Sequence, residues 1–290
     1  MTLSLRQPGP TAADRGTVSL APNASPTDVI TPRSPAPEAK PAYSLRALGR
    51  NDLPALIYIH QIPYQHERTV KHDFWAATGF YKSESGHRIV VKASRSAPFA
   101  GIPLRWAGRI LCQRELRFYR ALADIPNVPT VLATIGRTTL VHEFAPGTPL
   151  GKGVAIPDGY FSQLQQLLGL LHERNIAYVD TNKCPNILVG DDGEPHLIDF
   201  QISYDLKELG NTFINRWILR RLQREDFYHI LKHKLRLRPD EMTEEERLIA
   251  SKPSPWIRFH RRMTAPYFYV RRRVFRRLRE SGRLLPEGSE

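Results

Sequence analysis

Cysteines and long apolar runs are scarce in this sequence. Among its 290 residues only Cys112 and Cys184 are cysteines, and two widely spaced thiols give neither a disulfide framework nor a CxxC metal site. No stretch approaches the roughly 18 apolar residues of a membrane-spanning helix. The first residues, "MTLSLRQPGPTAADRG", also lack the continuous apolar segment of a signal peptide. These absences argue against a disulfide-stapled secreted domain and against a membrane-spanning protein, and we expect a cytoplasmic location.

Acidic residues are also in deficit. Lys and Arg number 42 and Asp and Glu 29, which gives a net charge of +13. Much of the excess lies between Trp256 and Arg283, where ten arginines and one glutamate alternate with aromatic residues. Such a segment suits an anionic partner: membrane headgroups, nucleic acid or an acidic substrate. The alternative is a solvated helix face whose apolar stripe packs on the body of the protein.

Composition divides the chain into four stretches. Residues 1–42 are rich in Pro, Ala, Ser and Thr, bury too little surface to offset their ordering entropy, and are predicted to be a disordered leader. Residues 43–145 are predicted to be rich in antiparallel strands with one helix, and residues 146–252 mainly helical. Residues 253–290 form the basic, aromatic tail. The predicted fold class is therefore α+β, with two lobes and a Pro/Gly-rich joint between them.

Turn signals and apolar periodicity locate the elements of the first half. "SESG" (83–86) predicts a hairpin turn, followed by a strand over 87–94 that ends near Lys92. Apolar residues at helical spacing predict a helix over 106–125 that closes before a proline. Residues 127–147 have the pattern of two further strands.

The second half is mostly helical by the same criteria. We predict a helix over 159–177 with Asp158 as its N-cap, and helical sequence from about 206 to 236. The acidic "DEMTEEE" predicts the start of another helix, capped by Thr243 or Asp240.

One stretch, "AYVDTNKCPNILVGDDGEPHLIDF", places polar residues beside apolar runs. "NILVG" (186–190) and "HLIDF" (196–200) are short strands joined by turn residues, and such a hairpin brings its outer ends together. Asn186, Asp199 and Asp180 should therefore meet at one edge. Mg²⁺ takes oxygen ligands and is typically held by one or two carboxylates plus substrate phosphates. The pattern thus predicts a magnesium site.

These motifs resemble the protein-kinase-like superfamily over roughly residues 55–235. "YVDTNKCPNILV" is similar to the catalytic loop H-R-D-x-K-P-x-N, and "IDF" to the start of D-F-G. The resemblance implies that Asp180 orients the attacking hydroxyl or accepts its proton, that Asn186 and Asp199 hold Mg²⁺, and that Lys183 neutralises the transferring phosphoryl group.

The upstream half shows the same likeness. Lys92, at the end of "IVVK", resembles the strand lysine that pairs the α- and β-phosphates of ATP, and Glu115 the helix glutamate that orients it. "LVHEFAPGTPL" resembles the hinge, which implies that backbone groups of Glu143, Phe144 and Ala145 bind the adenine. ATP and Mg²⁺ are therefore the expected cofactors.

Three features set the sequence apart from most protein kinases. No GxGxxG precedes Lys92, Gln201 follows "IDF" in place of glycine, and only a short stretch with no A-P-E separates Asp199 from the next helix. Such features are shared with atypical kinases that act on sugars, lipids or other small molecules. The style of the hinge "LVHEFAPGTPL" and the compact C-terminal part most resemble the lipopolysaccharide core kinases that phosphorylate Kdo or heptose, with RIO-type atypical kinases as a near second. The resemblance implies a sugar or glycolipid acceptor, and the basic tail suits attachment to the inner face of an anionic membrane better than nucleic acid.

Two alternatives stay open. The chain could be an atypical serine/threonine protein kinase, or a pseudokinase that binds nucleotide without catalysis.

Two further motifs do not predict a site. "GTPLGKG" (147–153) is one residue short of a Walker A loop and ends in Gly153 where Ser or Thr is needed. His229 and His233 have zinc-ligand spacing but lack the glutamate of H-E-x-x-H.

Overall fold

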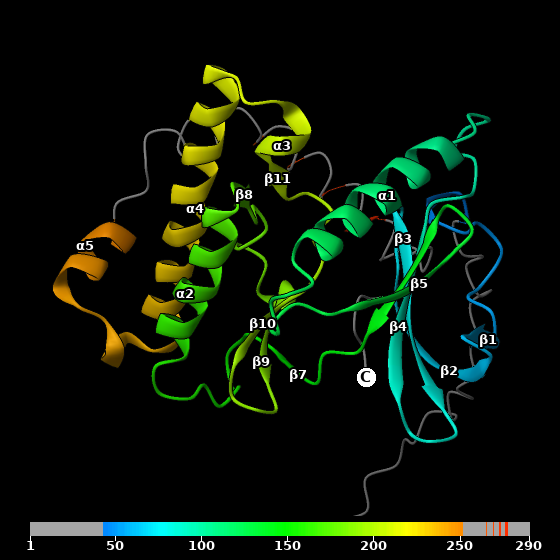
Figure 1. The fold of residues 1–290 in the computed structure, drawn as a ribbon, viewed down its shortest axis with the longest axis horizontal. Helices are drawn as coiled ribbons and strands as arrows, with labels where there is room; N and C mark the ends of the chain where they lie inside the picture. Colours follow the sequence, from blue (N-terminus) through cyan, green and yellow to red (C-terminus); the bar gives the residue numbers. More distant parts are fainter. Residues whose placement is uncertain (1–42, 252–264, 266–268, 270–272, 274–275, 278–290) are drawn as a thin grey trace, which may run out of the picture. The chain divides into compact units, whose positions relative to one another are not determined.

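The computed structural model describes residues 43–251 together with 265, 269, 273, 276 and 277 (Figure 1). The chain separates into two units, Met1–Glu38 and Ala39–Glu290, and every described residue belongs to the second. The predicted leader, 1–42, and most of the predicted tail, 253–290, lie outside the described residues. Within the described part, no helix has the length and apolar character needed to span a membrane.

The N-terminal part, residues 43–145, is built on one antiparallel sheet of six strands in the order β1-β2-β3-β4-β6-β5. A short 3₁₀ helix, Tyr43–Leu45, precedes the strands. The strands are β1 (Leu56–Ile59), β2 (Ile62–His72), β3 (Ala76–Ser83), β4 (Arg88–Ser94), β5 (Val131–Ile135) and β6 (Thr139–Glu143). The predicted turn at 83–86 joins β3 to β4, where the Gly86 N–H donates to the Ser83 carbonyl at 3.0 Å.

One helix, α1 (Arg105–Ala121), accompanies this sheet. Its buried side includes Cys112, Glu115 and Tyr119. The predicted helix ran to residue 125, whereas α1 ends at Ala121, with the Leu122 N–H still donating to the Phe118 carbonyl at 3.0 Å.

The C-terminal part, residues 146–251, is mainly helical. Its helices are α2 (Tyr160–Glu173), α3 (Leu206–Leu209), α4 (Phe213–Leu237) and α5 (Glu244–Ser251), with 3₁₀ turns at Cys184–Asn186 and Pro239–Glu241. Its strands are β7 (Gly147–Pro149), β8 (Ile176–Ala177), β9 (Ile187–Gly190), β10 (Pro195–Leu197) and β11 (Tyr204–Asp205). Figure 1 shows α2 alongside α4, away from the six-stranded sheet. A shared apolar core runs from α1 through α2 to the β9–β10 hairpin and includes Phe118, Leu164, Leu168, Ile187 and Phe200.

One sequence prediction about a helix end is wrong. Asp158 does not cap α2, because the N-cap is Gly159 in a left-handed conformation (φ 75°) and the Asp158 carboxylate pairs with Arg238 at 2.7 Å. The stretch over about 206–236 is mostly helical, as predicted, and consists of two helices: α3 ends at Leu209, Gly210 adopts φ 86°, and Thr212 caps α4. A left-handed glycine ends a helix because other residues pay a steric penalty there.

The capping of α5 is confirmed, and it is by Thr243. The Thr243 hydroxyl accepts from the Glu246 N–H at 3.2 Å, while the Glu246 carboxylate accepts from the Thr243 N–H at 3.0 Å. This reciprocal pair is a capping box.

The predicted fold class is confirmed. The chain is an α+β protein, with an antiparallel sheet and one helix in the N-terminal part and a mainly helical C-terminal part.

Candidate functional site

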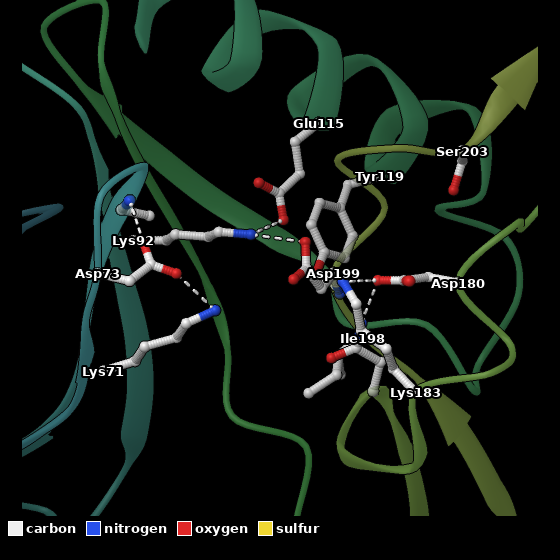
Figure 2. Close-up of polar contacts among 12 residues, drawn as sticks. Lys71, Asp73, Lys92, Glu115, Tyr119, Asp180, Lys183, Ile198, Asp199 and Ser203 are labelled. Atoms are coloured by element: carbon white, nitrogen blue, oxygen red, sulfur yellow. Dashed lines mark hydrogen bonds and ion pairs between the residues drawn. The ribbon is translucent and has the colours of Figure 1, made fainter. Parts of the chain in front are cut away.

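Lys92 lies at the centre of a charged cluster formed by three separate elements (Figure 2). Its ammonium, at the end of a side chain on β4, lies 2.8 Å from the Glu115 carboxylate of α1. It also lies 2.8 Å from the Asp199 carboxylate, just beyond β10. Lys92 is 8% exposed and Glu115 is 1% exposed. The residues that the sequence predicted to pair are therefore in contact.

The charged groups of this cluster keep one another ionised. Burial by itself would lower the pKa of the Lys92 ammonium, but the carboxylates of Glu115 and Asp199 outweigh it and raise the pKa, so Lys92 stays protonated. Burial would raise the pKa of Asp199, yet the charges of nearby lysines, Lys92 first, hold it below its usual value. The cluster thus presents an ammonium and an ionised carboxylate to the same space at neutral pH.

Helix α1 can hold Glu115 against Lys92 because Gly108 lets it approach β4 closely. A Cβ atom on Gly108 would lie 2.0 Å from the backbone oxygen of Arg95, the residue that follows β4. Every other amino acid would therefore push the helix away from the strand. The sequence analysis did not single out Gly108, although a glycine within an amphipathic helix is a signal of close approach.

Asp180 lies on the loop after β8 and is held by two partners that the sequence also predicted. Its Oδ2 accepts from the Lys183 ammonium at 2.8 Å and from the Asn186 side-chain amide at 2.7 Å. Asp180 is 3% exposed, and burial raises its pKa above the usual value even though Lys183 lowers it. A raised pKa makes this carboxylate a better proton acceptor.

Asp226 of α4 fixes the backbone of this loop, and the sequence analysis missed it. Its buried carboxylate accepts from the backbone N–H of Tyr178 at 2.9 Å and of Val179 at 2.8 Å, and from the Thr181 hydroxyl at 3.1 Å. Val179 has φ 70°, a strained value that these bonds maintain. Asp226 falls on the buried face of its helix, four residues before Ile230, and that spacing was the available signal.

The predicted hairpin of β9 and β10 brings Asn186 and Asp199 to the same end. The Ile198 N–H donates to the Asn186 carbonyl at 3.1 Å, and the Tyr178 hydroxyl donates to the same carbonyl at 3.1 Å. Beyond the hairpin, Asp199 takes φ 62° and its N–H donates to the Tyr119 hydroxyl at 3.2 Å. Tyr119, like Gly108 and Asp226, was not among the residues predicted from the sequence.

The predicted hinge begins at Glu143, the last residue of β6, and its three residues differ in what they offer a ligand. The Phe144 N–H donates to the Arg88 carbonyl at 3.4 Å, and the Glu143 carbonyl accepts from the His142 ring at 2.8 Å. Among the described residues, no hydrogen bond is made by the N–H of Ala145. Of the predicted adenine donors, Ala145 is the one left available within the described chain.

The side-chain oxygens fit a magnesium ion that is shared with a ligand. No group of three or more His, Cys, Asp or Glu side chains within the described ranges forms a self-contained metal site. The amide oxygen of Asn186 and the Oδ2 of Asp199 have no hydrogen-bond partner in that part of the chain. Two oxygens completed by ligand phosphates match the way proteins hold Mg²⁺.

Comparisons with known proteins give structural matches only. Neither protein-family models nor curated proteins match the sequence. The Rio2 kinase–ADP/Mg²⁺–phosphoaspartate complex from Chaetomium thermophilum aligns with a TM-score of 0.48 and 19% identity, covering 66% of this chain and 59% of that chain. The BubR1 kinase domain aligns with a TM-score of 0.46 and 16% identity, covering 64% of this chain and 66% of that chain. A second structure of the Chaetomium thermophilum Rio2 kinase gives 0.45 and 17% identity, covering 69% of this chain and 61% of that chain.

Proposed function

We propose that this chain is an ATP- and Mg²⁺-dependent phosphotransferase that transfers the γ-phosphoryl group to a hydroxyl. The observation that supports this most directly is the Lys92 ammonium, held 2.8 Å from both Glu115 and Asp199. A lysine fixed in this way offers a compact positive charge for the α- and β-phosphates.

Each remaining side chain has a role in the proposal. Mg²⁺, when bound, would supply charge neutralisation at the phosphates, and the free oxygens of Asn186 and Asp199 would hold it. Asp180 would orient the acceptor hydroxyl and take its proton. Lys183, 56% exposed on its side chain, would stabilise charge on the transferring group.

The acceptor is proposed only as a hydroxyl group. One feature favours a small acceptor such as a sugar: only β11 and α3 lie between Asp199 and α4, so a long peptide-docking segment is missing there. The comparisons offer no support for a lipopolysaccharide kinase. An atypical serine/threonine protein kinase, the first alternative, fits the site equally well.

A nucleotide-binding protein without catalysis is a second candidate, and one observation favours it. The Oδ2 of Asp180 already accepts two hydrogen bonds, from Lys183 and from Asn186. If both persist with nucleotide bound, this oxygen has little capacity to take a proton from an acceptor.

A transfer assay with labelled ATP separates these candidates. The parent chain and Asp180→Asn would be incubated with Mg²⁺ and panels of sugars, glycolipids, peptides and RNA, and nucleotide affinity would be measured by calorimetry. We expect transfer by the parent, a loss of roughly 100-fold or more in Asp180→Asn, and similar Mg·ATP affinity in both. Nucleotide binding without transfer to any acceptor would favour the non-catalytic candidate, and no binding would refute both.

A further inference from the structure

The turn between β2 and β3 occupies the position that covers the phosphates in glycine-rich kinases, yet it is built differently. It consists of only Asp73, Phe74 and Trp75. In glycine-rich loops, backbone N–H groups surround the phosphates. Here the Asp73 carboxylate accepts from the N–H groups of Trp75 at 2.8 Å and of Ala76 at 2.9 Å.

Further bonds fix the turn from behind. The Asp73 N–H donates to the Ala76 carbonyl at 3.0 Å. The buried Arg95 guanidinium donates to the Phe74 carbonyl at 2.8 Å and lies 3.9 Å from the centre of the Phe74 ring. The N–H groups of Asp73, Trp75 and Ala76 are thus occupied within the protein and are not offered to a ligand.

The register of the sheet places a lysine, Lys71, on the face of the charged cluster, close to the turn whose N–H groups are occupied. Thr78 of β3 pairs with Lys71 of β2 on one side and with Lys92 of β4 on the other. Directly paired residues point to the same face of a sheet, so Lys71 and Lys92 share the face of the cluster. A bulge produces this register, since Thr69 pairs with Gly79 and Lys71 with Thr78, leaving Val70 as the extra residue. Without that bulge, Val70 would take the position of Lys71.

The Lys71 ammonium is available to a ligand. It lies 2.8 Å from the Asp73 carboxylate, and its side chain is 47% exposed. Figure 2 shows Lys71 and Lys92 extending in parallel toward Asp199. The charge of Lys71 is among those that lower the pKa of Asp199, so it acts on the same space.

We propose that Lys71 is a second phosphate-binding residue, which contacts the terminal phosphates of a bound nucleoside triphosphate in place of loop amides. This inference rests on the proposed function, because it assigns a residue to the same site. Asp73 holds the ammonium in position and uses one of its three N–H donors, which leaves two for phosphate oxygens. Lys71 would add its positive charge to those of Mg²⁺, Lys92 and Lys183 in balancing the charge of a triphosphate.

Calorimetry with ATP, ADP and AMP in the presence of Mg²⁺ tests the role of Lys71. For Lys71→Gln we expect ATP affinity to fall by roughly tenfold or more, ADP affinity to fall less, and AMP affinity to stay unchanged. Lys71→Arg should retain most of the ATP affinity because it keeps the charge. Lys82→Gln, an exposed lysine near the far end of β3, serves as the matched control and should bind all three nucleotides like the parent.

The outcomes distinguish this inference from the proposed function. Unchanged ATP affinity in Lys71→Gln, or an equal loss for ATP and AMP, would overturn the inference while the proposed function stands. A melting temperature lowered in Lys71→Gln and equally in Lys71→Arg would show a structural role and also overturn it. Absence of Mg·ATP binding by the parent chain would refute the proposed function itself, and this inference with it.

Discussion

Charge at the Lys92 side chain is set by its two carboxylate neighbours, and neither neighbour is close to it in sequence. Asp199 is 107 positions away along the chain. Of the two, Asp199 is the more exposed, with 29% of its side chain accessible against 1% for Glu115. The two carboxylates therefore have different parts: Glu115 fixes the lysine from the buried side, and Asp199 faces the space where a ligand would bind.

Asp199→Asn is predicted to abolish Mg·ATP binding. A neutral amide replaces a carboxylate at a hard cation, and the Lys92 ammonium loses one counter-charge. Calorimetry should show no measurable Mg·ATP binding, against clear binding by the parent. Asp192→Asn, a change in the β9–β10 turn, is the control and should bind normally. An unchanged affinity in Asp199→Asn would remove Asp199 from the metal site.

His142 makes the stability of the fold depend on pH. It is 6% exposed, its ring stacks on Tyr119 with centroids 5.1 Å apart, and burial lowers its pKa from 6.5 to about 4. Between these two values the unfolded chain binds a proton that the folded protein does not, so the free energy of unfolding falls as the pH is lowered from 6.5 to 4.

Replacing His142 by Phe should remove part of this pH dependence. Denaturant unfolding would give the free energy of unfolding at pH 7 and at about pH 4.5. Between these two pH values the parent should lose about 2 kcal/mol more stability than the variant does. The exposed His60→Asn serves as the control. If His142→Phe loses as much stability as the parent, another group carries the effect.

At the scale of elements, the approach of α1 to β4 decides whether Glu115 reaches Lys92. Gly108→Ala tests this, because helix propensity predicts that the substitution raises stability, whereas packing predicts that it lowers stability. Propensity favours alanine by about 1 kcal/mol, whereas a Cβ 2.0 Å from the Arg95 backbone oxygen must displace backbone. Overpacking of this kind costs about 1 to 3 kcal/mol, so we expect a net loss of stability and weaker Mg·ATP binding.

Gly169→Ala in α2 is the matched control for that substitution. A Cβ at Gly169 would meet no atom within 4 Å, so propensity alone applies and the melting temperature should rise. Thermal melts and calorimetry on both variants would measure the contrast. A stabilised Gly108→Ala with full nucleotide affinity would show that α1 can shift at no cost.

Helix α4 fixes the loop that carries Asp180 through one buried carboxylate, that of Asp226. Asp226→Ala would leave the N–H groups of Tyr178 and Val179 and the Thr181 hydroxyl without their acceptor. Losing such a buried network costs about 3 to 5 kcal/mol. In denaturant unfolding, Asp226→Asn should lose less stability than Asp226→Ala because one oxygen remains. Equal stability of the parent and both variants would contradict the assigned role.

At the scale of the whole molecule, we predict that the candidate site works without the basic tail. The residues assigned to the site lie between Lys71 and Asp226, well before residue 253. Truncation after Pro253 removes the arginine-rich segment and is predicted to weaken binding to anionic vesicles, where each Arg near the surface contributes about 1 kcal/mol. Mg·ATP affinity should stay within about twofold of the parent, because no assigned contact is lost.

Sedimentation with phosphatidylserine vesicles would measure that binding, with phosphatidylcholine vesicles as the uncharged control. Unchanged binding to anionic vesicles would refute a membrane role for the tail. Loss of nucleotide affinity together with vesicle binding would mean that the tail is part of the fold.

Local signals in the sequence determined much of the architecture. The turn after Ser83, the β9–β10 hairpin and the Thr243 cap were predictable because each depends on residues only a few positions apart, whose backbone preferences and hydrogen bonds act within one turn. The order of Lys92, Glu115, Asp180, Asn186 and Asp199 was also readable, since it follows the order of known motifs, although the interval from Asp180 to Asn186 is one residue longer than the usual pattern.

Only the tertiary structure decided how these residues are held and what accompanies them. Asp158 does not cap α2 as predicted, because its carboxylate forms an ion pair with Arg238, 80 positions away. Asp226 is buried under a loop some 47 positions earlier. A single bulge at Val70 turned Lys71 to the face of Lys92. Each outcome depends on packing and strand register between distant segments, and neither periodicity nor spacing within one segment contains that information.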